Sequence, residues 1–154
     1  MIIYKVGNLL DAEEHIIAHG VNASGGYASG VARQIAIKYP KAKQEYLHKF
    51  RTEGWVLGDI QAVICDGRIV VNCCTQQNYG RELTIYCDYN AIQQCVEKLL
   101  LACKKNGLSL AIPKIGAGLA NGCWIHISED IERLSEKYGI DVNVYILSEN
   151  DHKE

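Results

Sequence analysis

The sequence lacks a long apolar run and an excess of basic residues. No stretch approaches the ~18 consecutive apolar residues of a membrane-spanning helix, and the first residues, MIIYK, do not have the basic and then apolar pattern of a secretory leader. Lys and Arg number 16 against 18 Asp and Glu, a net charge of −2, which argues against general binding to nucleic-acid backbones. We expect a soluble, cytoplasmic protein with no membrane partner and no general nucleic-acid partner.

Proline is scarce as well, with 2 residues in 154, whereas 48% of the residues are hydrophobic and 22% are charged. This composition excludes a mainly disordered chain. A chain of this length buries roughly two-thirds of its unfolded surface, so a core can form without metal or disulfide support. We predict one domain over residues 1–147, a short charged tail at 148–154, and a monomer.

Paired cysteine motifs are missing, because no two cysteines have the C-x-x-C spacing and their number is odd. The seven are Cys65, Cys73, Cys74, Cys87, Cys95, Cys103 and Cys123. Most fall in apolar periodic segments, where a free thiol acts as a small hydrophobe. We interpret them as core thiols of a reducing cytoplasm and expect no cofactor and no metal. The alternative is a nucleophilic or zinc-bound cysteine.

What the sequence does contain is an alternation of short apolar strands and amphipathic helices. Strands are predicted at 1–6, 15–21, 60–65, 68–74, 108–112 and 141–147. Helices are predicted from 31 to before Pro40 and at 41–53, 89–106 and 124–138. The dipeptide Asp66-Gly67 favours an antiparallel hairpin, whereas the later alternation favours parallel strands with right-handed crossovers. We therefore predict an α/β fold with a mixed sheet and helices on both faces, and little structure in the connection 8–14.

Two glycine-rich loops, at 25–30 and 115–119, each follow a predicted strand and precede a helix. In α/β sheets ligands bind at the carboxyl ends of the strands, where free main-chain N–H groups and a helix N-terminus hold anions such as a diphosphate. Neither loop matches the P-loop pattern G-x-x-x-x-G-K-[ST] or the dinucleotide pattern G-x-G-x-x-G. The alternative is that these glycines only permit tight turns.

Four separated motifs, in this order, resemble the macrodomain family. They are HGVN at 19–22 with the first glycine loop, KYPKA at 38–42, TQQNYG at 75–80 and IPKIGAGL at 112–119. The resemblance extends from Met1 to Leu147 and is greatest to the branch that contains the ADP-ribose 1''-phosphate phosphatases. It implies a three-layer macrodomain fold, a cleft for ADP-ribose or a derivative, and no metal requirement for binding.

The resemblance also implies which residues hold the ligand. The set is Asn8, Leu9, Asn22, Gly25, Gly26, Tyr27, Ala28, Ser29, Gly30, Val31, Thr75, Gln76, Gln77, Tyr79, Gly80, Ile115, Gly116, Ala117, Gly118 and Leu119. The first two would contact adenine, the glycine loops would hold the diphosphate and distal ribose, and segment 75–80 would form the remaining wall. Asn8 stands where the family usually has Asp, so its amide oxygen would have to accept the adenine hydrogen bond. The alternative for Tyr79 is that it only covers the core.

His19 and Asp88 are the candidate catalytic residues. His19 matches the position of the catalytic histidine of the phosphatase branch, and a histidine near its ordinary pKa can activate water or protonate a leaving oxygen. Its alternative is a hydrogen-bonded core histidine. Asp88 is the candidate acidic partner, and its alternative is the N-cap of the helix that begins at Tyr89.

The resemblance therefore implies hydrolysis of ADP-ribose 1''-phosphate to ADP-ribose and phosphate. Two alternatives stay open: a module that only binds or sequesters ADP-ribose or another NAD-derived nucleotide, and an ADP-ribosyl hydrolase. Macrodomains of the covalent, lysine-dependent branch carry a lysine in the segment that matches 75–80 and an aspartate after the Gly-x-Gly-Leu run. Here Gln76, Gln77 and Ala120 stand at those places, which argues against that chemistry.

Overall fold

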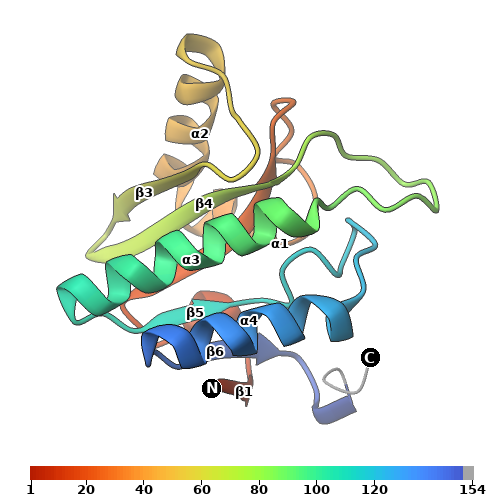
Figure 1. Cartoon of the computed structure of the whole chain (residues 1–154). Coiled ribbons are helices and arrows are strands. Elements are labelled where there is room, and N and C mark those ends of the chain that lie inside the picture. The colour runs from red at the N-terminus through yellow and green to blue at the C-terminus, as the bar shows by residue number, and fades with distance from the viewer. Residues whose placement is uncertain (151–154) are drawn as a thin grey trace.

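A six-stranded mixed sheet forms the centre of the computed structural model, which describes residues 1–150 (Figure 1). Its strands are β1 (Ile2–Val6), β2 (Ile16–Asn22), β3 (Ile60–Cys65), β4 (Arg68–Gln76), β5 (Leu110–Ile112) and β6 (Val142–Ile146), in the order β1-β6-β5-β2-β4-β3. Only β3 and β4 pair in antiparallel fashion. Their hairpin turns at Asp66 and Gly67, both with positive φ, as the two-residue turn requires.

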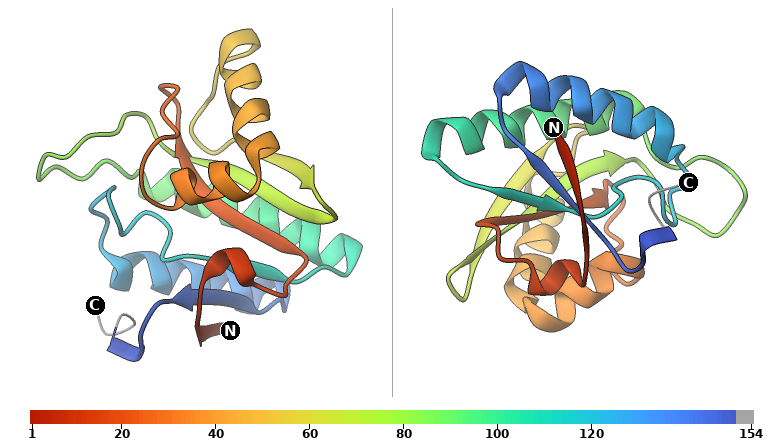
Figure 2. Two further views of the ribbon diagram at one scale, coloured as in Figure 1. Left: turned by 180° about the vertical axis from the view of Figure 1, so that it is seen from behind. Right: turned by 90° about the horizontal axis from the view of Figure 1, so that it is seen from below.

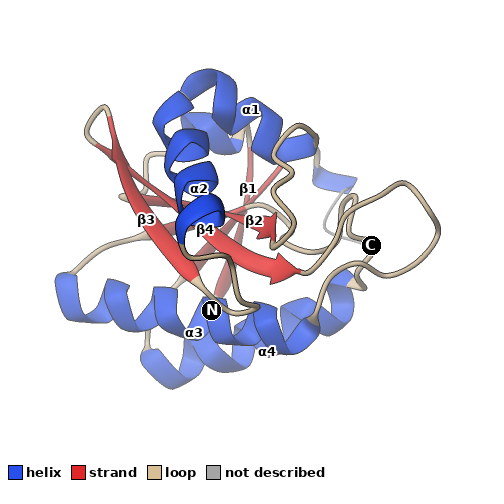
Figure 3. Cartoon of the chain, turned by 90° about the horizontal axis from the view of Figure 1, so that it is seen from above, coloured by secondary structure: helices blue, strands red, loops and turns tan. Residues whose placement is uncertain are grey.

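Helices cover both faces of the sheet. They are α1 (Gly30–Lys38), α2 (Pro40–Thr52), α3 (Tyr89–Asn106) and α4 (Trp124–Tyr138). Figures 2 and 3 show α3 and α4 on one face and α1 and α2 on the other. The three-layer α/β architecture predicted from the sequence is confirmed.

Two apolar clusters fix these layers, one on each face of the sheet. The predicted stripe of α3 is buried against α4 and the sheet at Ile92, Val96, Leu99, Leu100 and Cys103. The opposite cluster includes residues of α1, α2, β3 and β4 and the neighbouring, mutually tilted rings of Tyr27, Tyr46 and Trp55. Strand β2 is buried along nearly its whole length, which is typical of a central parallel strand covered on both faces.

The structure differs from the sequence predictions mainly at the ends of elements. The connection 8–14 contains a short 3-10 helix, η1 (Leu9–Asp11), because the Asn8 side chain accepts a hydrogen bond from the main-chain N–H of Leu10 at 3.0 Å. Strands β2 and β4 extend to Asn22 and Gln76, one and two residues beyond the predicted ends.

The cysteines follow the predicted pattern for the most part. Six are buried free thiols, and Cys123 is exposed. Of the predicted tail at 148–154, residues 151–154 lie outside the described part of the chain. Within residues 1–150, no helix combines the length and the apolar character needed to cross a membrane.

Candidate functional site

Two adjoining cavities, of about 320 and about 600 Å³, open at the carboxyl ends of β2, β5 and β6. We call them the first and the second cavity. Four residues line both, namely Val31, Pro113, Lys114 and Gly118. The cavities therefore form one elongated cleft, with these residues at the junction. This is the edge of a parallel sheet at which ligands of α/β proteins bind.

Most of the residues predicted to hold a ligand lie in this cleft. The first cavity is lined by Asn22, Gly26, Tyr27, Ala28, Ser29, Gly30, Val31, Thr75, Gln76, Tyr79, Ile115, Gly116, Gly118 and Leu119. The second is lined by Asn8, Leu9, Val31, Ala117 and Gly118. The structure thus brings together residues from four separate segments of the chain, 8–9, 22–31, 75–79 and 115–119. Their contact with a ligand remains a prediction.

Three predicted binding residues, Gly25, Gln77 and Gly80, line neither cavity. The two glycines are places of close packing. A Cβ added at Gly25 would lie 2.9 Å from the Phe50 ring, and one at Gly80 would lie 2.4 Å from the Tyr86 hydroxyl. Both positions support the shape of the loops that carry them.

Residues with unpaired main-chain N–H groups line the first cavity in two separate segments. On one side, helix α1 begins without a side-chain cap at Ser29, and within residues 1–150 the N–H groups of Val31 and Ala32 have no acceptor. On the other side, the N–H groups of Gly118 and Leu119 are also without an acceptor in the described chain. A helix N-terminus carries partial positive charge, so the two sides can hold an anion without a side-chain charge.

The side chain of Asn22 holds the first glycine loop in place. Its Nδ2 donates to the carbonyl of Gly26 at 2.8 Å, and its Oδ1 accepts from the main-chain N–H groups of Ser24 and Gly26, both at 3.0 Å. The buried Tyr46 hydroxyl donates to the Asn22 carbonyl at 2.7 Å and accepts from the N–H of Gly25 at 3.1 Å. Burial raises the pKa of Tyr46 to about 12, so the hydroxyl keeps its proton. These bonds fix the loop conformation that forms one wall of the first cavity.

His19 lies beneath this wall and is fully buried. Its Nε2 is 2.7 Å from Oδ1 of Asn72 and 2.9 Å from the hydroxyl of Tyr27, which itself donates to Oδ1 of Asn72 at 2.7 Å. Because an amide oxygen only accepts, Nε2 must carry the proton. Burial lowers the pKa of His19 to about 4, so the ring is neutral near pH 7.

The position of His19 bears on its two sequence-based interpretations, a catalytic histidine and a hydrogen-bonded core histidine. The ring lines neither cavity, and its hydrogen bonds are those of a core histidine. Its Nδ1 has no partner within the described residues, and the same holds for Oγ1 of Thr75, a residue that lines the first cavity. The catalytic role of His19 remains a prediction.

Asp88 caps helix α3. Its Oδ1 accepts from the main-chain N–H of Ala91 at 2.8 Å, and its own N–H donates to the carbonyl of Thr75 at 2.8 Å. The carboxylate lines neither cavity. The N-cap that we gave as the alternative is therefore present, and a catalytic role for Asp88 is still a prediction.

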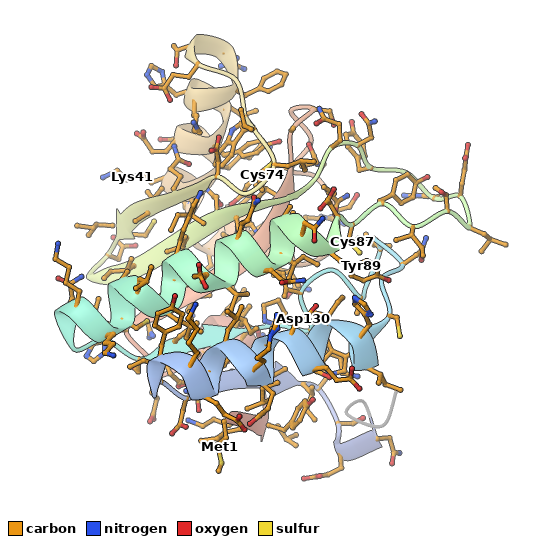
Figure 4. All side chains as sticks on the ribbon, viewed as in Figure 1. Met1, Lys41, Cys74, Cys87, Tyr89 and Asp130 are labelled. Atoms are coloured by element: carbon orange, nitrogen blue, oxygen red, sulfur yellow. The ribbon has the colours of Figure 1, made fainter. Side chains whose placement is uncertain are left out.

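The loop between β4 and α3 projects from the molecule (Figure 1). Its Tyr79 lines the first cavity and packs against Gly26, where a Cβ would lie 2.4 Å from the Tyr79 ring. Figure 4 shows Cys87 and Tyr89 where this loop returns to α3. The Tyr89 hydroxyl accepts from the main-chain N–H of Cys123 at 3.1 Å, which ties this end of the loop to the start of α4.

Sequence reasoning missed several residues of the cleft. Apolar residues of α4 and β6 line the second cavity, among them Trp124, Ile125 and Ile146. Lys114 lines both cavities and is the sole charged residue in their lining. The signal that could have found them is position, because Lys114 follows β5 closely and Ile146 ends β6, both at the predicted binding edge. Residues 1–150 contain no group of three or more His, Cys, Asp or Glu side chains placed to hold a metal.

Comparisons with known proteins agree with this architecture. A model of the family described as Macro domain matches residues 18–126. The human protein named ADP-ribose glycohydrolase OARD1 is 27% identical over 148 residues, covering 95% of this chain and 91% of that protein. The ADP-ribose 1''-phosphate phosphatase of Lodderomyces elongisporus is 24% identical over 142 residues, covering 86% of each chain.

A solved structure shows the same fold at lower identity. The macrodomain of Mycobacterium tuberculosis DarG superposes with a TM-score of 0.83 at 19% identity, covering 96% of this chain and 99% of that one. Since the matched region of the family model contains most of β2, the first glycine loop and the loop after β5, it includes most of the cleft. The chain belongs to the Macro domain family.

Proposed function

We propose that the chain binds ADP-ribose or a close derivative in the two-cavity cleft. The observation that carries this proposal is the pair of N–H sets without an acceptor, in α1 and in the loop after β5, whose residues line the first cavity. A diphosphate between them would receive hydrogen bonds from both sides. Both relatives quoted above carry names that refer to ADP-ribose, which supports the same ligand.

The two cavities suit the two ends of such a ligand. The second is the larger and is lined by Leu9, Trp124 and Ile125, so it offers apolar surface to a purine. Asn8 at its rim uses Oδ1 for the bond to Leu10, and this oxygen has a second lone pair for an adenine amino group. The first cavity, with Asn22 and Thr75 in its lining, would take the distal ribose.

We further propose hydrolysis of ADP-ribose 1''-phosphate as the reaction. Water attacks the phosphorus, the bond between phosphorus and the distal ribose oxygen breaks, and that oxygen leaves with a proton. The burial of His19 favours a role through Gly20 and Asn22, the neighbours on β2 that line the first cavity, over direct contact with the phosphate.

A second candidate function is binding without chemistry. Lys114 and the two tyrosines Tyr27 and Tyr79 are the titratable side chains in the lining of the first cavity. Burial raises the pKa of Tyr27 far above its usual range, so its hydroxyl is not an acid or base near pH 7. The absence of a lysine in 75–80 and of an acidic residue at Ala120 argues against the lysine-dependent glycohydrolase reaction.

Titration calorimetry with ADP-ribose tests the binding proposal, and release of inorganic phosphate from ADP-ribose 1''-phosphate tests the reaction. We expect wild type to bind ADP-ribose and to release phosphate. Binding without release would assign the second function, and no heat or other signal of binding would overturn both. A His19→Gln variant that folds and releases phosphate at the wild-type rate would exclude His19 from the chemistry.

A further inference from the structure

Lys114 stands at the centre of the cleft, at the one place where its two cavities meet. It follows Pro113 at the end of β5, the short central strand between β2 and β6. Its carbonyl accepts from the N–H of Ala117 at 3.1 Å, and the N–H of Ile115 donates to the carbonyl of Pro113 at 2.7 Å. These two bonds fix the backbone on both sides of Lys114, so the position of its Cα is set by the fold.

The charge of Lys114 has no counterpart in the protein. Among the described residues its ammonium group makes no ion pair and no hydrogen bond, and no other residue in the lining of either cavity is charged. The side chain is half-buried, which weakens screening by water and salt compared with a fully exposed lysine. An unpaired, partly buried cation in an otherwise uncharged cleft favours an anionic ligand at that point.

The residues that share the junction with Lys114 supply neutral donors for the same anion. Val31 lies in the first turn of α1, and Gly118 lies in the loop after β5. The N–H groups of both have no acceptor in the described chain. Three residues with a free donor, one from α1 and two from the loop after β5, therefore line both cavities, and one of them carries a full positive charge.

We propose that Lys114 binds the diphosphate of the ligand and selects ligands in which a diphosphate joins a nucleoside in the second cavity to a sugar in the first. This inference rests on the proposed function and names a specificity-determining residue for it. A neutral nucleoside in the second cavity would offer no negative charge to the Lys114 ammonium group. A nucleoside monophosphate would offer a single phosphate, whereas the diphosphate can accept from Lys114 and from both N–H sets together.

The test compares Lys114→Gln with Lys105→Gln, which makes the same charge change at an exposed site in the last turn of α3. Calorimetry is run with ADP-ribose, ADP and adenosine. We expect Lys114→Gln to weaken ADP-ribose binding by about 10-fold, the size of one charge-assisted hydrogen bond, and to leave adenosine unchanged. Lys105→Gln should match wild type with every ligand, and Lys114→Arg should recover most of the affinity.

The salt dependence of ADP-ribose affinity is a second measurement, and it would not change if Lys114 had only a structural role. Because the lysine acts through its charge, the decline of wild-type affinity between low and high salt should be steeper than that of Lys114→Gln. Equal ADP-ribose affinities for Lys114→Gln and Lys105→Gln would overturn the inference while leaving the proposed function intact. Wild type that binds ADP but not ADP-ribose would refute the proposed function and also the inference, because the inferred ligand carries a sugar in the first cavity. Binding of neither ligand would likewise overturn both.

Discussion

The burial of His19 predicts a specific dependence of stability on pH. In the folded chain the pKa of His19 is about 4, lowered from 6.5 by burial. The unfolded chain therefore takes up a proton at this histidine well before the folded chain does, and stability falls as the pH drops from about 6.5 to about 4. The difference between these two pKa values corresponds to about 3 kcal/mol of stability when the titration is complete. Between pH 7 and pH 5 the loss is about 2 kcal/mol.

Urea unfolding at pH 7 and pH 5 measures this loss, with His19→Gln as the matched variant. Every other titrating group is present in both proteins, so the difference between their two pH effects isolates His19. The variant loses buried hydrogen bonds with Asn72 and Tyr27, which lowers its stability at both pH values but does not change the comparison. We expect wild type to lose about 2 kcal/mol more than the variant. An equal loss in both would show that His19 is charged in the folded protein or reaches solvent, contrary to its burial.

Three further predictions concern the cleft itself. Gly122→Ala should destabilise the fold by about 1–3 kcal/mol, because the added Cβ would lie 2.5 Å from the carbonyl oxygen of Gly116. Gly118→Ala should unfold like wild type, because its added Cβ would have no atom within 4 Å. Denaturant titration of the two variants measures this difference. Cys123 is the exposed thiol and lines the second cavity, so a thiol reagent should label it first, and bound ADP-ribose should slow that labelling in a time course read by mass spectrometry. Asn22→Asp should reduce ADP-ribose affinity by at least about 10-fold in calorimetry, since the carboxylate places a negative charge beside the proposed diphosphate and the Nδ2 donor is lost. Unchanged affinity would contradict the proposal that Asn22 and its loop form a wall of the ligand site.

The sequence predicted the elements well because their signals are local. The αL glycine after α3, Gly107, and the hairpin at Asp66-Gly67 are positions where the chain must take positive φ, and glycine there is a direct chemical requirement. The apolar residues of α3 likewise recur every three or four positions in the sequence, and the same residues are buried in the core. The η1 turn was missed because it depends on one side-chain bond from Asn8, which composition alone does not reveal.

The cleft was predicted only in part because its remaining residues are brought together by strand order. β5 lies between β2 and β6, although 87 residues of chain separate the end of β2 from the start of β5. The residues after each strand can be placed together only once this order is known, so the position of Lys114 and Ile146 after a strand was the one signal that marked them. The glycine motifs identified part of the cleft from sequence, whereas the apolar wall and the lone cation were missed.

Strand order also explains why His19 is so deeply buried. β2 is a central strand paired with β4 and β5, and successive side chains of a strand point to opposite faces. The His19 side chain points toward the layer of α1 and α2, where it is hydrogen-bonded to Tyr27 and Asn72. His19 is three residues before the end of β2, and its ring therefore lies under the cleft and not in it. Asn22, at the end itself, is the side chain of β2 that reaches both the loop and the cavity. The chemistry of this site therefore depends on the strand ends and the loops after them, and the buried polar residues of the strands act by holding those ends in place.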